Sequence, residues 1–155
     1  MSKHRSAGGH EKPVKGATNE WYTPQYILDA LGPFDDDPAR PGRIDGLTRA
    51  WNGLVWLNPP YGPECGTWLN KLADHGSGVA LVFARTETKW FGRAVWERAS
   101  ALRFLQGRIS FMKNGEQAKG NSGAPSVLVA YGDQAVGRLI RCRLPGFLIT
   151  EWIDL

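Results

Sequence analysis

The sequence contains few residues of the kinds that bind metals or form disulfides. Its 155 residues include two cysteines, Cys65 and Cys142, and three histidines. The cysteines have no CxxC spacing and no nearby histidine, which argues against a zinc site and against a disulfide framework. We therefore expect no bound metal and two free thiols, as in a protein of the reducing cytoplasm.

The sequence also lacks a long hydrophobic segment. No apolar run approaches the ~20 residues of a membrane-spanning helix, and the charged N-terminus has no apolar core of a secretory signal, so we expect no membrane association. The chain does contain 42% hydrophobic residues, with 7 Trp, 4 Tyr and 6 Phe. This composition is sufficient for one hydrophobic core at this length. It predicts a single domain over residues 17–155 behind a flexible basic tail, residues 1–16.

Charge is unevenly distributed along the chain. The formal net charge is +4, but residues 17–84 hold eight acidic and four basic residues, whereas residues 85–143 hold four acidic and eleven basic residues. The basic stretch fits a surface for a polyanion, and it equally fits a solvated helix face with charged loops.

Hydrophobic runs bounded by glycine and proline alternate with amphipathic segments. The expected helices cover residues 24–31, 67–75 and 88–99. The expected strands cover residues 53–57, 78–84, 102–105, 109–111, 126–131 and 147–149, and a polar loop covers residues 113–125. This alternation predicts an α/β fold with a mostly parallel central sheet, in which ligands bind beyond the carboxyl ends of the strands.

The tetrapeptide Asn58-Pro59-Pro60-Tyr61 directly follows one of the expected buried strands. Two consecutive prolines force a rigid, extended turn, which holds the Asn58 amide and the Pro59 carbonyl as fixed acceptors. Tyr61 adds a flat aromatic face beside them. The group suits a planar ring with an exocyclic NH₂, whose nitrogen becomes a better nucleophile when two acceptors favour its pyramidal form. A plain strand-ending turn with a packed tyrosine is the alternative.

Other segments accompany this tetrapeptide in order along residues 20–131. They are Glu20-Trp21-Tyr22-Thr23-Pro24, Phe34, Asp37-Pro38-Ala39, Asp45-Gly46-Leu47, Trp51, residues 84–91, residues 104–111 and Ala124-Pro125-Ser126. Together they resemble the small phage-type DNA N6-adenine methyltransferases, the phage Dam-like family. The resemblance implies a compact Rossmann-like methyltransferase domain in the cytoplasm of a bacterial host. It implies site-specific transfer of a methyl group from S-adenosylmethionine to adenine N6 in DNA.

The resemblance also implies roles for individual residues. The catalytic motif is Asn58, Pro59, Pro60 and Tyr61. The cofactor-binding residues are Tyr22, Thr23, Pro24, Asp37, Pro38, Ala39 and Asp45. The Asp-Pro-Ala turn replaces the Gly-x-Gly turn of most methyltransferases, and a carboxylate there can bind the amino group of the cofactor. Asp37 is favoured over Asp35 for this contact, and a solvated acidic turn is the alternative.

Residues expected to contact DNA lie in the basic part of the chain. They are Arg85, Thr86, Arg108, Lys113 and Lys119, with Arg103 and Thr88 as further candidates. For Thr86 and Glu87, capping of the following helix is an equally weighted interpretation. Trp68 and the aromatic stripe of residues 90–96 are expected to pack in the core.

The sequence leaves open the substrate, the choice between an enzyme and a binding module, the DNA target sequence and the oligomeric state. The same chemistry serves cytosine N4, adenine in RNA and the side chain of a protein glutamine, and a non-catalytic module that binds DNA or the cofactor is the alternative outside enzymes. The DNA target sequence and the oligomeric state are not encoded in any motif. For duplex DNA, the target adenine has to leave the base stack to reach a pocket.

Overall fold

The computed structural model describes residues 22–113, 116–117 and 123–154. Its centre is a five-stranded sheet with the order β1-β2-β6-β3-β7. The strands are β1 (Val55–Leu57), β2 (Gly78–Phe83), β3 (Ala101–Leu105), β6 (Ser126–Tyr131) and β7 (Gly146–Ile149). The helices are α1 (Gln25–Leu31), α2 (Cys65–His75), α3 (Lys89–Phe91), which continues as the π-helical turn η1 (Gly92–Trp96), and α4 (Asp133–Arg141). A separate two-stranded hairpin joins β4 (Met112–Lys113) to β5 (Glu116–Gln117).

The prediction of a mostly parallel sheet is wrong. Among the strands of this sheet in the described residues, β1 and β2 pair in parallel, whereas the pairs β2–β6, β3–β6 and β3–β7 are antiparallel. Strands β1, β2 and β3 still run in one direction, but β6 enters between β2 and β3 and runs against both. Every residue of β6 is buried, just as in a central parallel strand. Burial on both faces therefore did not distinguish the two directions.

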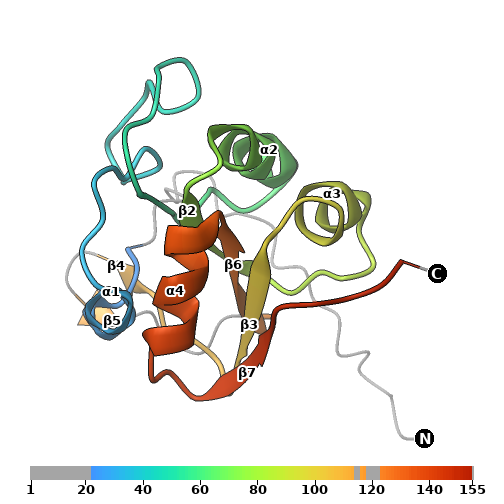
Figure 1. Cartoon of the computed structure of the whole chain (residues 1–155). Helices are drawn as coiled ribbons and strands as arrows, with labels where there is room; N and C mark the ends of the chain where they lie inside the picture. The colour runs from blue at the N-terminus through green and yellow to red at the C-terminus, as the bar shows by residue number, and fades with distance from the viewer. Residues whose placement is uncertain (1–21, 114–115, 118–122, 155) are drawn as a thin grey trace, which may run out of the picture.

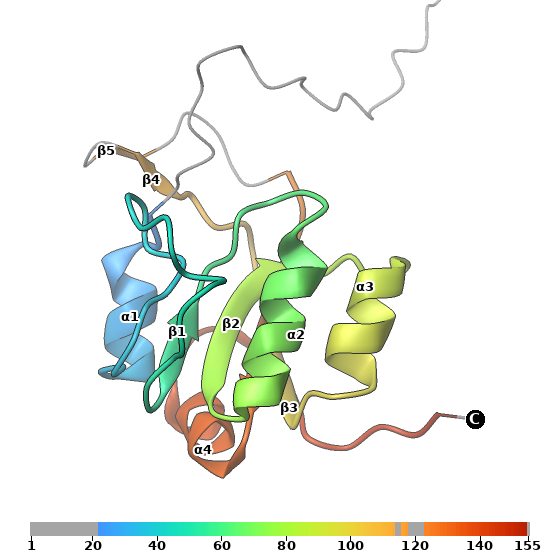
Figure 2. The same cartoon turned by 90° about the horizontal axis from the view of Figure 1, so that it is seen from above.

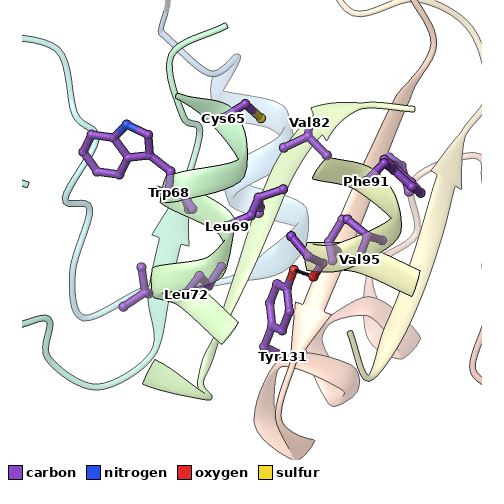
Figure 3. Packing of buried hydrophobic residues seen from close by; sticks show 14 of the residues in the cluster. Cys65, Trp68, Leu69, Leu72, Val82, Phe91, Val95 and Tyr131 are labelled. Carbon is purple, nitrogen blue, oxygen red and sulfur yellow. Dashed lines mark hydrogen bonds between the residues drawn. The ribbon is translucent and has the colours of Figure 1, made fainter. Parts of the chain in front are cut away.

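Helices cover both faces of the sheet, with α2 and α3 on one side and α1 and α4 on the other (Figures 1 and 2). Figure 3 shows the first of these layers, which contains Leu69 and Leu72 of α2 and Val82 of β2. Phe91 and Val95 complete it, and the Tyr131 hydroxyl donates a hydrogen bond to the carbonyl of Ala94. The aromatic stripe of residues 90–96 and Trp68 are core residues, as predicted.

Most of the expected elements are present, with four differences. The β4–β5 hairpin overlaps the polar loop expected over residues 113–125. Helix α4 was not expected from the sequence, and residues 109–111 are not a strand. The expected helix over residues 88–99 ends at Trp96, because its second half widens into the π-helical turn. Thr88 caps its start by accepting a hydrogen bond from the Phe91 amide, so neither Thr86 nor Glu87 is the cap.

Among the described residues, no helix is both long enough and apolar enough to cross a membrane. Cys65 and Cys142 are both buried free thiols, as predicted.

Candidate active site

The acidic segment and the double-proline turn leave the same edge of the sheet side by side. Asp36 forms an isolated parallel bridge with Val55, and the Trp56 amide donates to the Asp36 carbonyl at 2.9 Å. The chain therefore enters Asp37 beside the point where β1 ends and Asn58 begins. Two turns far apart in the sequence are brought together here, as expected for the carboxyl ends of neighbouring parallel segments.

Two cavities meet at Asn58. A cavity of about 300 Å³ is lined on one side by Tyr22, Thr23 and Asp37. A smaller cavity of about 90 Å³ is lined by the tetrapeptide itself, residues 58–61. Asn58 and Ala39 belong to the walls of both cavities. The double-proline turn is therefore joined through Asn58 to the Asp-Pro-Ala turn by open space.

Thr23 fixes the side chain of Asn58 in this position. The Asn58 Nδ2 atom donates a hydrogen bond to Thr23 Oγ1 at 3.2 Å, and Trp56 Nε1 donates to the same oxygen at 3.3 Å. Thr23 does not cap α1, because Pro24 occupies the N-cap position without a side-chain cap. The Thr23 hydroxyl instead connects the start of α1 to the end of β1.

Two of the three consecutive aspartates, Asp35 and Asp36, make hydrogen bonds that stabilise the fold. Asp36 accepts two hydrogen bonds from the Arg49 guanidinium, at 2.7 and 2.8 Å, and a third from the Asn52 amide at 3.1 Å. The hydrogen bonds from Arg49 lower the pKa of Asp36 to about 2. Asp35 accepts from the Leu54 amide at 2.8 Å. Both carboxylates tie the acidic segment to the loop that precedes β1.

Asp37 differs from its two neighbours. Among the described residues its carboxylate has no hydrogen-bond or ion-pair partner, and it lines the 300 Å³ cavity and a further cavity of about 670 Å³ beside α1. Partial burial raises its pKa to about 6, although Arg40 and Arg43 act in the opposite direction. A desolvated carboxylate that faces a cavity is suited to bind a cationic group.

Tyr61 is held in an aromatic cluster at the corner. Its ring stacks on Phe83 with centroids 4.3 Å apart, and the Phe111 ring approaches it at 5.9 Å in an edge-to-face arrangement. Burial raises the pKa of the Tyr61 hydroxyl, which stays protonated at neutral pH. One face of the ring is therefore occupied by Phe83, so a stacked base has only the opposite face.

The remaining predicted cofactor residues take different positions. Ala39 lines the two cavities at Asn58, whereas Pro24 and Pro38 are buried in the supporting structure. Asp45 lines none of the three cavities described, its side chain is 58% exposed, and it approaches Arg49 at 3.9 Å. The structure thus brings Tyr22, Thr23, Asp37 and Ala39 to Asn58, but not Asp45.

Of the predicted DNA-contacting residues, Arg85 is placed beside the aromatic cluster at this corner. The Arg85 guanidinium lies 5.9 Å from the centroid of the Phe83 ring, which itself stacks on Tyr61. Thr86 and Arg108 are exposed. Lys113 lies in β4, which begins directly after Phe111. Lys119 lies outside the described residues, as does most of the predicted polar loop.

Arg103 was a candidate for a phosphate contact, and this prediction is wrong. Its guanidinium donates to the carbonyl of Leu144 at 2.6 and 3.2 Å and to that of Leu139 at 3.5 Å. Arg103 therefore joins β3 to the end of α4 and to the segment that follows it. This role of Arg103 was not predicted because α4 itself was not expected.

Several residues of the site were not identified from the sequence, among them Arg40 and Trp56. Arg40 lines all three cavities, and Trp56 lines two of them while its indole holds Thr23. Arg40 lies one residue beyond the Asp-Pro-Ala turn, and this proximity was the available signal. Trp56 read as an ordinary strand residue.

Comparison with known proteins identifies the family. A family model described as DNA N-6-adenine-methyltransferase (Dam) matches residues 42–137, a segment that includes the Asn58–Tyr61 turn and Arg85. No curated protein and no solved structure matches the chain. The family match covers more than half of the sequence, and the chain therefore belongs to the DNA N-6-adenine-methyltransferase (Dam) family.

Proposed function

We propose that this protein transfers a methyl group from S-adenosylmethionine to N6 of adenine at specific sites in DNA. One observation carries the proposal: Asn58 lines both the cavity that contains Asp37 and the cavity formed by the double-proline turn. A side chain at this junction can reach a nucleobase from one cavity and a methyl donor from the other. Family membership supports DNA adenine as the substrate.

The residues around the larger of these two cavities fit the methionine end of the cofactor. Asp37 offers a partly buried carboxylate for the ammonium group, and Tyr22 and Thr23 line the same cavity. An ion pair with that ammonium would lower the pKa of Asp37 again, so binding would relieve an unfavourable burial. When bound, S-adenosylmethionine supplies an electrophilic methyl group on a sulfonium.

Asn58 and Pro59 would orient the amino nitrogen of the base. The Nδ2 side of the Asn58 amide is held by Thr23, which fixes the plane of the amide and the direction of its carbonyl oxygen. That oxygen and the Pro59 carbonyl would accept the two N6 hydrogens and favour a pyramidal nitrogen. Tyr61, held by Phe83, would support the ring with its remaining face.

The sheet is compatible with a Rossmann-like methyltransferase arrangement in which two strands are reversed. β1, β2 and β3 share a direction, the site follows the carboxyl ends of β1 and the Asp36 segment, and β6 and β7 run the other way. We include this fold relationship in the proposal.

Incubation with methyl-labelled S-adenosylmethionine tests the function. DNA, RNA and protein are offered separately, and the DNA is digested to nucleosides. We expect label in N6-methyl-2′-deoxyadenosine from the DNA. Label in N4-methyl-2′-deoxycytidine, in RNA or in protein would redirect the proposal, and no label in any of them would favour a module that only binds.

The Asn58→Ala variant tests the residue assignment. Methyl transfer should fall below detection, while cofactor binding measured by calorimetry stays within a few-fold of wild type, because Asn58 acts on the base. Asn52→Ala is the matched control, since Asn52 is an exposed asparagine at the other end of the β1 segment. Wild-type turnover in Asn58→Ala would exclude the proposed role.

A further inference from the structure

The connection between α1 and β1 presents a hydrophobic side chain to solvent beside the site. This connection projects away from the sheet as the cyan loop of Figure 1. Ile44 lies within it and is 100% exposed, the highest value among the exposed large hydrophobic residues described. A fully exposed isoleucine contributes nothing to the stability of the fold, because an apolar side chain stabilises a protein by being buried.

Two arginines that line the cavities lie close to Ile44 in the chain. Arg43, its neighbour in the chain, lines both the cavity of the double-proline turn and the 670 Å³ cavity. Arg40 lines these two and the third. Residues 40–44, here called the arginine loop, contain no acidic residue, although the surrounding segment is acidic overall.

The far side of the arginine loop is firmly anchored. Gly46 is buried, and a Cβ atom there would lie 2.3 Å from the Pro38 carbonyl oxygen and 2.5 Å from the Trp68 ring. Trp51 Nε1 donates to the Gly46 carbonyl at 2.7 Å. Lys71 Nζ donates to the Leu47 carbonyl at 2.8 Å. The exposed isoleucine is thus displayed from a fixed base two residues away.

This combination matches a need of the proposed reaction. An adenine that leaves a duplex for a pocket abandons its stacking partners and leaves a gap between them. Apolar side chains that insert between base steps can fill such a gap, and neighbouring arginines hold the phosphates on either side. Ile44, directly after two cavity-lining arginines, offers both functions within five residues.

We propose that the arginine loop enters the DNA duplex beside the target adenine, with Ile44 occupying the space that the flipped base leaves and Arg43 contacting the backbone. The inference rests on the proposed function and adds a positioning residue to it. Ile44 touches neither the reacting nitrogen nor the methyl donor, and it acts by stabilising the flipped state.

The first test compares two substrates once the methylated site is mapped. One is a duplex with that site, and the other is the same duplex with an abasic position opposite the target adenine. Ile44→Ala should lower kcat/KM on the normal duplex about tenfold and much less on the abasic duplex, where the adenine is already unpaired. Ile153→Ala is the matched control, because Ile153 is 81% exposed far from the site in sequence.

Both alternative outcomes count against the inference. An unchanged rate on the normal duplex shows that Ile44 is not needed, and an equal loss on both duplexes shows a general structural effect. Failure of the wild-type protein to methylate either duplex would instead contradict the proposed function, on which the inference depends.

The second test needs no methyl transfer. Both native cysteines are buried, so Ile44→Cys introduces an accessible thiol. Saturating duplex DNA should slow its reaction with a maleimide at least tenfold, whereas the thiol of Ile153→Cys should react at the same rate with and without DNA. Equal reactivity of the Ile44→Cys thiol in the presence and absence of bound duplex would overturn the inference.

Discussion

Thr23 accepts a hydrogen bond from the Asn58 side chain across 35 positions of sequence, at 3.2 Å. The pair joins the start of α1 to the end of β1, and both residues line the same cavity. The threonine that the family resemblance assigns to the cofactor and the asparagine assigned to the base thus form one unit. The orientation of Asn58 depends on whether Thr23 is in place.

Thr23→Val tests this dependence. Valine keeps the shape of threonine but removes the hydroxyl that accepts from Asn58 and Trp56. We expect kcat to fall about tenfold, because a misoriented amide loses part of its effect on the reacting nitrogen and one hydrogen bond is worth ~1 kcal/mol. Steady-state kinetics with saturating cofactor measures it. Thr23→Ser should restore most of the rate, and a loss in KM alone with unchanged kcat would contradict the orienting role.

The position of the corner was predictable because proline chemistry is local. Two prolines after a buried run end the strand wherever the chain folds, so Asn58 and Tyr61 were assigned correctly to the end of β1. From the sequence, Asp37 was favoured for the cofactor contact, but the three aspartates Asp35, Asp36 and Asp37 were not separated. Three adjacent carboxylates have the same local signal, and their partners in the fold, above all Arg49, separate them.

The direction of β6 and the presence of α4 are two features of the fold that were not predicted from the local sequence. β6 is an unbroken apolar run, and its reversal follows from how it enters between β2 and β3. Arg40 was missed for a similar reason. Its place in three cavity walls depends on the course of the whole loop, and in the sequence its signal was only its position directly after the Asp-Pro-Ala turn.

Arg49→Ala should destabilise the fold. Arg49 makes two short hydrogen bonds to Asp36, whose side chain is only 7% exposed and which keeps its Asn52 contact. The lowered pKa of Asp36 means that the pair contributes stability above the ordinary pKa of about 4, and that this contribution is lost as the pH falls to about 2. We expect a loss of about 1–2 kcal/mol at pH 7 by urea denaturation, and almost none near pH 2.

Arg98→Ala serves as the comparison for that measurement. Arg98 contacts Asp74 at 2.6 Å, but the Asp74 side chain is 74% exposed. Solvent screening limits such a pair to a few tenths of a kcal/mol. Equal losses in the free energy of unfolding for the two substitutions at pH 7 would show that the Arg49–Asp36 pair contributes no more to stability than an exposed ion pair.

Arg85→Ala should weaken DNA binding. The Arg85 guanidinium lies over Phe83, next to the ring of Tyr61, and thus close to the proposed entry of the base. Loss of one phosphate contact should lower the slope of log affinity against log salt by about one. Fluorescence anisotropy at several salt concentrations measures it. Arg143→Ala, an exposed arginine beyond α4, is the control, and equal slopes for both variants would exclude a specific contact of Arg85.

Asp37→Asn should stabilise the fold and weaken cofactor binding. The pKa of Asp37 is raised to about 6 chiefly by burial, so the folded state favours the protonated carboxyl. The contribution of the protonated Asp37 carboxyl to stability is therefore fully present below the ordinary pKa of about 4, and it is lost as the pH rises through 6. At pH 7 the asparagine should raise the free energy of unfolding by about 1–2 kcal/mol, allowing for partial solvent exposure, and the gain should vanish near pH 4.

Cofactor binding should show the opposite preference. If the Asp37 carboxylate holds the ammonium group, wild-type affinity should fall as the pH drops below about 6, because protonation removes the charge. Asp37→Asn should bind at least tenfold more weakly at pH 7 and show no such pH dependence. Asp45→Asn is the control, since Asp45 is exposed outside the three cavities. A stable Asp37→Asn variant with wild-type affinity would move the ammonium site to another residue.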